Sequence, residues 1–341
     1  MDFALSEEHR MIMETTKAFV DKEMKPHEDE IERTGVIPPE LVPELRKKAI
    51  EAGLFAANLP EDVGGAGLDT VSWVCFEKEL SKTNYGLHWT TVCRPSNALL
   101  ACVGEQREKY LFPCVRGEKA DCLAMTEPGA GSDLRGMKAS AKQDGDDWIL
   151  NGTKHFISYA DWADFAICFM ASGEEDTPRG KKKLITSFFV DKGHPGFTIR
   201  DGYKNVAHRG FNNCILEFDN CRVPKEAVLG EVHKGFDVAN DWLGATRLQI
   251  AAGCVGRAEI AMDHSLQWSV ERQQFGQQIG KFQGVSFKLA DMAMQMRASW
   301  LLTLETAWKY DEGTVTDMDM AMAKLHATEM LQMVSDEAIQ I

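Results

Sequence analysis

Residues Ala124–Gly136 have the sequence AMTEPGAGSDLRG, a stretch with three glycines, several oxygen-bearing side chains and almost nothing that could fill a core. It lies where the pattern of the chain changes from helical to strand-like. Before about Cys122 the apolar residues follow a helical period, and from about Leu123 to Leu229 short runs are rich in branched and aromatic residues. This change of period predicts a helical domain followed by a β domain.

Helical patterns occupy both ends of the chain. Ser6 is a predicted N-cap with two glutamates in the following turn, and a second helix, PPELVPELRKKAIEAGLF, is expected to end at Gly53. From about Gly235 onward apolar residues return at three- and four-residue spacing, and Gly253 and Gly256 would allow close helix contact. The order helices, strands, helices predicts an α+β fold and argues against alternating βαβ units.

The expected middle domain contains alternating runs and one polar segment. In ILEFDNCRVP, Leu216 and Phe218 alternate with Glu217 and Asp219, as in a half-buried strand. The segment SGEEDTPRGKKK is expected to be a mobile surface loop. The predicted domains are an all-α domain (1–122), a β domain (123–233) and a C-terminal domain resembling a four-helix bundle (234–341).

Composition excludes several classes of protein. The chain has 341 residues and a net charge of −14, which disfavours a nucleic-acid partner. No apolar run approaches the roughly 18 residues of a membrane span, and the acidic start MDFALSEEHR does not resemble a leader. We therefore expect a cytoplasmic protein or a mature form whose leader has been removed. The nine cysteines contain no C-x-x-C pair, which favours reduced, mostly buried thiols and no metal site.

The glycine-rich stretch has two interpretations on its own. Gly129 and Gly131 would let the backbone approach a ligand, and free N–H groups with the Thr126 and Ser132 hydroxyls suit a phosphate or a polar heterocycle edge. A plain surface turn is the alternative. GAGSDLRG lacks the G-x-G-x-x-G spacing of a dinucleotide fold and the G-K-[ST] of a P-loop.

A second segment, LNGTKHFISYADWADFAICF, follows some twenty residues later. Strand alternation would place Phe156 and Ser158 on one face, and His155 on the opposite face, pointing away from Phe156. An aromatic wall beside a hydroxyl would suit a flat redox-active ring with one polar edge. Ordinary sheet packing is the alternative.

Taken together, the motifs resemble those of the acyl-CoA dehydrogenase family of flavoproteins over the whole chain. AMTEPGAGSD is similar to that family's flavin signature, KHFIS to the segment beside the isoalloxazine, and ERQQFGQQIGKFQ to its dinucleotide segment. The resemblance implies FAD as cofactor. The implied FAD-binding residues are Met125, Thr126, Gly131, Ser132, Phe156, Ile157, Ser158, Arg272, Gln274, Phe275 and Gln283.

The resemblance also implies which part of FAD each residue contacts. Met125 and Thr126 would meet the pyrimidine edge, Phe156 would pack on the ring, and Ser158 would bond near N5. The residues from Arg272 to Gln283 would hold the FAD of a neighbouring subunit, which implies a homo-oligomer, commonly a tetramer. A solvated helix end is the alternative for ERQQFGQQ taken alone.

The family's reaction removes the α-proton of an acyl-CoA as the β-hydrogen leaves as hydride to the flavin, with electron-transfer flavoprotein as acceptor and fatty-acid β-oxidation as the usual setting. The implied substrate residues are Ser132, Leu243, Thr246 and Arg247. Arg94, a cation amid an apolar helical pattern, is a further candidate that would meet a polar or anionic acyl tail, with a snorkelling surface residue as the alternative. Gly244 departs from a family pattern that has an aspartate at this position. Glu127 and Asp133 lie in the flavin loop but are expected to cap backbone N–H groups.

No catalytic base is identified within these residues. One branch of the family has a glutamate before the first arginine of the C-terminal helices, but here the pair is Thr246 and Arg247. The commoner branch has it after a Q-x-x-G-G motif, whose first residue would be Gln340. The last helical pattern, opened by Thr316, reaches Ile341 without Gly, Pro or a basic last turn. We therefore expect a truncated form whose base lies beyond Ile341.

Three functions remain open from the sequence. The first is an acyl-CoA dehydrogenase that passes electrons to an electron-transfer flavoprotein. The second is an oxidase or an enoyl-CoA-type reductase on the same scaffold, acyl-CoA oxidase and nitroalkane oxidase included. The third is a protein that binds FAD and acyl-CoA without catalysis.

Overall fold

The structure is a computed structural model that describes residues 4–92, 95–178 and 180–341. The chain divides into two compact units, and each is described by itself. We call them the helical unit (Met1–Glu28, Gly67–Asn84 and Leu243–Ile341) and the sheet unit (Asp29–Ala66 and Tyr85–Trp242). The mixed α+β class is confirmed, while the three domain boundaries stay a prediction.

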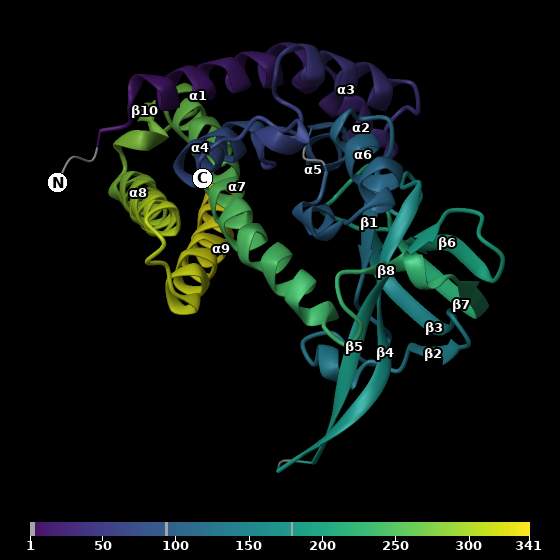
Figure 1. Cartoon of the computed structure of the whole chain (residues 1–341). Coiled ribbons are helices and arrows are strands. Elements are labelled where there is room, and N and C mark those ends of the chain that lie inside the picture. The colour runs from purple at the N-terminus through teal and green to yellow at the C-terminus, as the bar shows by residue number, and fades with distance from the viewer. Residues whose placement is uncertain (1–3, 93–94, 179) are drawn as a thin grey trace. The chain divides into compact units, whose positions relative to one another are not determined.

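The helical unit is built from long amphipathic helices. Ser6 caps the first by accepting from the His9 amide at 3.2 Å, and Thr316 caps the last through a capping box with Asp319, as predicted. Figure 1 shows α8 and α9 packed side by side. The helices are α1 (Glu7–Phe19), α4 (Thr70–Leu80), α7 (Gly235–Glu271, which belongs to this unit from Leu243), α8 (Gln283–Asp311) and α9 (Asp317–Gln340).

Contact between α4 and α7 depends on a glycine. A Cβ added at Gly256 would overlap the Lys78 carbonyl oxygen, so the close helix contact expected from this glycine is confirmed. Beside it, Lys78 and Lys82 pair with Glu259, and the Lys78 ammonium lies 5.3 Å from the centre of the Trp300 ring. Because Lys78 and Trp300 are both buried, this polar group forms part of the helix packing.

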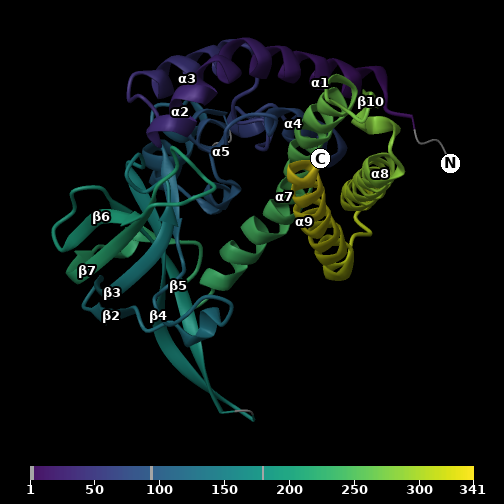
Figure 2. The same cartoon turned by 180° about the vertical axis from the view of Figure 1, so that it is seen from behind.

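In the described chain, the sheet unit contains one eight-stranded sheet. Seven strands follow the order β6-β7-β3-β2-β4-β5-β8, and the eighth, β1, pairs parallel to β4. Figure 2 shows β3, β6 and β7 from behind. The strands are β1 (Asp121–Ala124), β2 (Ser140–Asp144), β3 (Asp147–Ser158), β4 (Phe165–Thr177), β5 (Gly180–Asp191), β6 (Phe197–Tyr203), β7 (Asn213–Val223) and β8 (Val228–Leu229).

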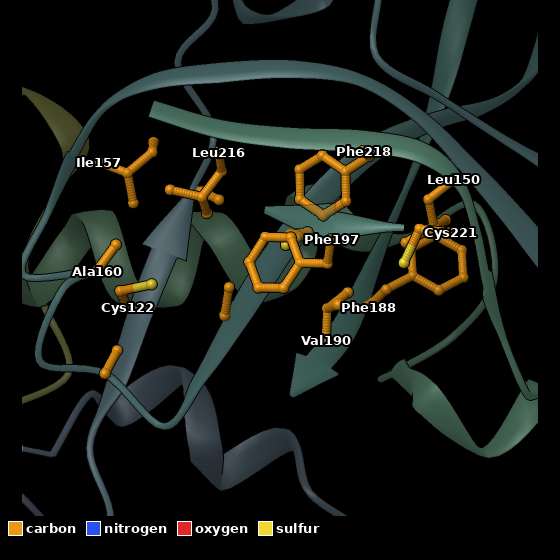
Figure 3. Packing of buried hydrophobic residues seen from close by; sticks show 14 of the residues in the cluster. Cys122, Leu150, Ile157, Ala160, Phe188, Val190, Phe197, Leu216, Phe218 and Cys221 are labelled. Carbon is orange, nitrogen blue, oxygen red and sulfur yellow. The ribbon is translucent and has the colours of Figure 1, made fainter. Parts of the chain in front are cut away.

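The buried face of this sheet follows the predicted alternation. Leu216 and Phe218 of β7 are buried, and Phe197 of β6 stacks on Phe218 with ring centres 4.9 Å apart. Figure 3 shows these side chains gathered with Phe188 and Val190 of β5. The core therefore lies under the strands that carry the candidate site.

Short helices belong to the same unit, and residues of two of them, α5 and α6, pack in the same apolar clusters as the strands. Arg46 of α3 donates hydrogen bonds to the Tyr159 hydroxyl (2.7 Å) and to the Thr90 carbonyl (3.1 Å). The second predicted helix corresponds to α3, and Gly53 follows its end with φ of +70°, as expected. The helices are α2 (Glu28–Thr34), α3 (Leu41–Glu51), α5 (Tyr85–Leu87) and α6 (Phe112–Val115).

The prediction of a mobile surface loop for SGEEDTPRGKKK is wrong. These residues extend β4 and β5 into an antiparallel hairpin that pairs as far as Thr177 and Gly180. The acidic side of the segment is Glu174–Asp176 and the basic side is Lys181–Lys183, so opposite charges face each other across the two strands. Cross-strand pairing thus compensates for the polar composition that suggested a loop.

The described cysteines are free and buried, as predicted, and Cys93 lies outside the described residues. Burial raises the pKa of Cys75 and of Cys102 to about 12, which keeps both thiols protonated at neutral pH.

Candidate functional site

The glycine-rich loop leads from β1 to β2 and leaves open space above its backbone. Neither Gly129 nor Gly131 has a positive φ, and a Cβ added at either would meet nothing within 4 Å. The hydroxyls of Thr126 and Ser132 make no hydrogen bond to any residue that the structure describes. Packing within the described chain therefore does not require glycine at these two positions. A ligand that lies directly against this backbone would require it, because a Cβ would occupy the same space.

A buried ion pair holds this loop against β3. Lys154, whose side chain is fully buried, donates to Glu127 Oε1 at 2.7 Å and to the Met125 carbonyl at 3.1 Å. Glu127 also accepts from the backbone N–H groups of Lys138 (2.6 Å) and Ala139 (3.0 Å). Burial lowers the pKa of Lys154, although the Glu127 carboxylate acts in the opposite direction.

These contacts decide between two roles for Glu127. A carboxylate that already accepts from an ammonium and two amides has little capacity left to take a substrate proton. The expectation that Glu127 caps backbone N–H groups is confirmed. Asp133 differs, because it is exposed and makes no capping hydrogen bond.

A backbone hydrogen bond joins the two predicted flavin segments directly. The His155 N–H donates to the Thr126 carbonyl at 2.9 Å, so the loop and β3 form one surface. Met125 is 8% exposed beside this bond, whereas Phe156 is 48% exposed. The structure thus brings Met125, Thr126 and Phe156 together.

The orientation expected for His155 on β3 is wrong, because the strand changes register after Lys154. The register moves from Lys154–Leu216 to Ile157–Cys214, so β3 has one residue more than β7 in this interval. Phe156 takes φ of +54° in this bulge, and the His155 ring faces it with centres 4.2 Å apart. His155 therefore does not point away from Phe156.

The other two residues of this segment differ in exposure. Ile157 is 2% exposed and belongs to the sheet core, where Figure 3 labels it, so its side chain contacts protein. Ser158 is half-buried, and its hydroxyl lies 3.5 Å from Asn213 Oδ1, a long contact that leaves it free to bond elsewhere.

The predicted dinucleotide segment belongs to the helical unit. It forms a small antiparallel hairpin of β9 (Gln273–Gln274) and β10 (Gln277–Gln278), turned by Phe275 and Gly276 at positive φ. Phe275 is 93% exposed, and the Arg272 guanidinium lies 6.0 Å from the Trp268 ring centre. Gln274 and Gln283 are also exposed, so none of the four predicted side chains is covered by its own unit.

The predicted substrate residues lie on α7, apart from two. Leu243, Thr246 and Arg247 are half-buried in the helical unit, and Arg247 forms an ion pair with Asp317 at 3.5 Å. Ser132 is exposed on the loop of the sheet unit. Arg94 lies outside the described residues.

Two features of the site had no clear signal in the sequence. The pairing of Glu127 with Lys154 spans 27 residues, and Tyr203 of β6 lies against Phe156 with ring centres 4.4 Å apart. Each depends on strands that meet only in the folded sheet.

Comparison with known families identifies the chain over most of its length. The acyl-CoA dehydrogenase N-terminal domain matches residues 6–118, the middle domain matches 122–221 and the C-terminal domain matches 233–341. The chain belongs to the acyl-CoA dehydrogenase family. It is accordingly an enzyme of the oxidoreductase class, which its named relatives share.

The named relatives of this acyl-CoA dehydrogenase family member include both dehydrogenases and a subunit of a reductase complex. The human mitochondrial short-chain specific acyl-CoA dehydrogenase is 34% identical, covering 99% of this chain and 81% of its own. Subunit CarC of the caffeyl-CoA reductase-Etf complex of Acetobacterium woodii is 33% identical, covering 98% and 88%. The structure of butyryl-CoA dehydrogenase from Megasphaera elsdenii superposes with a TM-score of 0.88 at 33% identity, covering 100% and 89%.

The described part of this acyl-CoA dehydrogenase family member has neither a metal-ligand cluster nor a membrane-spanning helix. Within the described residues, no group of three or more His, Cys, Asp or Glu side chains is placed to hold a metal ion. None of the described helices has both the length and the apolar character needed to cross a bilayer.

Proposed function

We propose that this protein uses FAD to dehydrogenate an acyl-CoA thioester between its α and β carbons and passes the electrons to an electron-transfer flavoprotein. The observation that carries the proposal is the loop of Gly129 and Gly131, which is open above its backbone and is hydrogen-bonded to His155, next to the exposed Phe156. The family relationship supports it, as does the name of the CarC relative, which belongs to a complex with an electron-transfer flavoprotein.

The residues present fit FAD. Thr126 and Ser132 offer hydroxyls without partners in the described chain, Gly131 leaves room for a phosphate against the backbone, and Phe156 offers an exposed aromatic face beside Ser158. When bound, FAD would supply the acceptor for the hydride that leaves the β carbon. The chain contributes a rigid surface for the cofactor, because the buried Lys154 and Glu127 pair and the His155 N–H fix the loop to β3.

The chain's own side chains also limit the chemistry that can be assigned. Thr246 has no group that could remove an α-proton, and Glu127 already accepts three hydrogen bonds. Arg247 offers a half-buried cation for the phosphates of CoA. We therefore assign cofactor and substrate binding to these residues and leave the base unassigned.

A second direction of reaction has support from one relative. CarC is named as part of a caffeyl-CoA reductase complex, so we keep reduction of an enoyl-CoA as the second candidate. Both directions use the same binding surface, and they differ in which partner delivers or accepts electrons.

The oligomer is part of the proposal. We propose that the exposed side chains of Arg272, Gln274, Phe275 and Gln283 hold the FAD of a neighbouring copy in a homotetramer. Sedimentation of the FAD-loaded protein should give a tetramer, and a monomer with full FAD affinity would contradict this part.

The test is an anaerobic titration of the purified, FAD-loaded chain with butyryl-CoA and longer or aryl-substituted acyl-CoAs, following the oxidised flavin absorbance band. Bleaching by a saturated acyl-CoA supports dehydrogenation. Reoxidation of the dithionite-reduced protein by an enoyl-CoA, without bleaching by any saturated substrate, favours the reductase. A chain that binds no FAD would overturn the proposal, and oxygen consumption at the rate of turnover would point to an oxidase.

A further inference from the structure

Phe156 is held in a backbone conformation that an aromatic residue rarely adopts. Its φ is +54°, in the left-handed region that residues with a Cβ normally avoid, and nearly half of its surface is exposed. A strained and exposed ring keeps one orientation only if its neighbours hold it there.

Two rings flank Phe156 and also contact each other. The His155 ring centre lies 4.2 Å from that of Phe156, and the ring centre of Tyr203, at the end of β6 on the other side of β7, lies 4.4 Å from that of Phe156. The Tyr203 hydroxyl lies 3.2 Å from His155 Nδ1, within hydrogen-bond distance. The three side chains therefore form a closed triangle, which we call the aromatic triad.

The sheet brings the triad together through two bulges over the same stretch of β7. One extra residue in β3 falls between Lys154 and Ile157, and one extra residue in β6 falls between Arg200 and Tyr203. Asn213 of β7 is the register partner of both Ser158 and Tyr203, so β7 aligns the two bulges. Phe156 and Tyr203 meet because both neighbours of β7 are displaced at the same level.

A glycine permits the second bulge. A Cβ added at Gly202 would overlap the Asn213 carbonyl oxygen, so β6 can approach β7 this closely only with glycine at this position. The result places Tyr203, which is itself 41% exposed, against Phe156.

We propose that Tyr203 and His155 are positioning residues that hold the Phe156 ring in place for FAD, so that Tyr203 sets how tightly the chain binds its cofactor. The inference rests on the proposed function, because it assigns the exposed face of Phe156 to the flavin ring. Tyr203 acts through Phe156 and not by a contact of its own.

The experiment is a double-mutant cycle read out as the FAD dissociation constant of the full chain. The variants are Phe156→Ala, Tyr203→Ala and the double variant, each titrated with FAD by fluorescence and recorded by visible circular dichroism. Tyr203→Ala should weaken FAD binding about two- to ten-fold, the size expected for one aromatic pair. In the Phe156→Ala background the same change should have almost no further effect.

Two more variants separate positioning from a general loss of structure. Tyr203→Phe keeps the ring contact and should recover most of the affinity, and His155→Ala should weaken FAD binding from the other side of the triad. Val206→Ala, at a side chain that is 95% exposed three residues beyond Tyr203, is the matched control and should bind FAD as the wild type does.

The outcomes distinguish this inference from the proposed function. A wild-type chain that binds no FAD overturns both. A wild-type chain that binds FAD while Tyr203→Ala and His155→Ala bind it equally well overturns the inference alone. Losses that add fully in the double variant also overturn it, because Tyr203 would then act independently of Phe156. No recovery in Tyr203→Phe overturns it as well, because the ring contact with Phe156 would then not be what matters for FAD binding.

Discussion

The buried pair of Glu127 and Lys154 should be the most sensitive polar contact of the sheet unit. Removing one member of a buried ion pair costs about 3–5 kcal/mol, because the other charge stays buried without a partner. Glu127→Ala also removes the acceptor of the part-buried Lys138 N–H and of the buried Ala139 N–H, and leaving the buried donor unpaired costs about 1–3 kcal/mol. We expect Glu127→Ala to lose at least about 3 kcal/mol of unfolding free energy, and Glu127→Gln less, since its amide oxygen can still accept from the backbone.

The assay is urea unfolding of each variant, followed by far-ultraviolet circular dichroism. The double variant Glu127→Gln with Lys154→Met removes both charges, so its loss should be clearly smaller than the sum of the two single losses. Lys182→Met is the matched control, because Lys182 pairs with Glu175 on the same sheet but both side chains are more than 40% exposed. This control should lose less than about 1 kcal/mol.

Two results would refute this reasoning. One is a Glu127→Ala variant within about 1 kcal/mol of the wild type, which would mean that the pair contributes no more than a surface ion pair. The other is a double variant whose loss equals the sum of the single losses, which would mean that the two charges do not interact.

Two further predictions concern the helical unit. Gly256→Ala should cost about 1–3 kcal/mol, because the new Cβ would overlap the Lys78 carbonyl, whereas Gly244→Ala on the same helix meets nothing within 4 Å and should not destabilise; thermal melts of both variants give the comparison. Burial acts to raise the pKa of Glu259, but ion pairs with Lys78 and Lys82 hold it below its usual value. The contribution of Glu259 to the free energy of unfolding should therefore be present above about pH 4.5 and be lost as the pH falls further. In Glu259→Gln the free energy of unfolding should fall less steeply with pH in this acidic range. An unchanged slope would contradict a stabilising role of the ionised Glu259.

Local chemistry was sufficient to predict the helix ends and the order of the segments. A hydroxyl followed by acidic residues fixes a helix start through bonds within three residues, as at Ser6 and Thr316. The alternation of Leu216 and Phe218 likewise shows which side of a strand is buried. The motifs around Thr126 and Phe156 were sufficient to recognise the family, because they are short and contiguous.

Predictions from the sequence were wrong where the conformation of a segment depends on pairing with a strand far away in the chain. The polar segment Glu174–Lys183 suggested a loop, since its charges are paired only when β4 lies beside β5. His155 was expected to face away from Phe156, because alternation holds only while a strand keeps its register.

By itself, then, the sequence determined the class of the fold, the helix caps and the short motifs that identify the family, because each depends on neighbours within a few residues. The tertiary structure alone decided that Glu127 is bound to Lys154 and that Tyr203 lies against Phe156. Both follow from the pairing of β3 with strands and loops far away in the chain, where a one-residue bulge changes the side toward which every later side chain points.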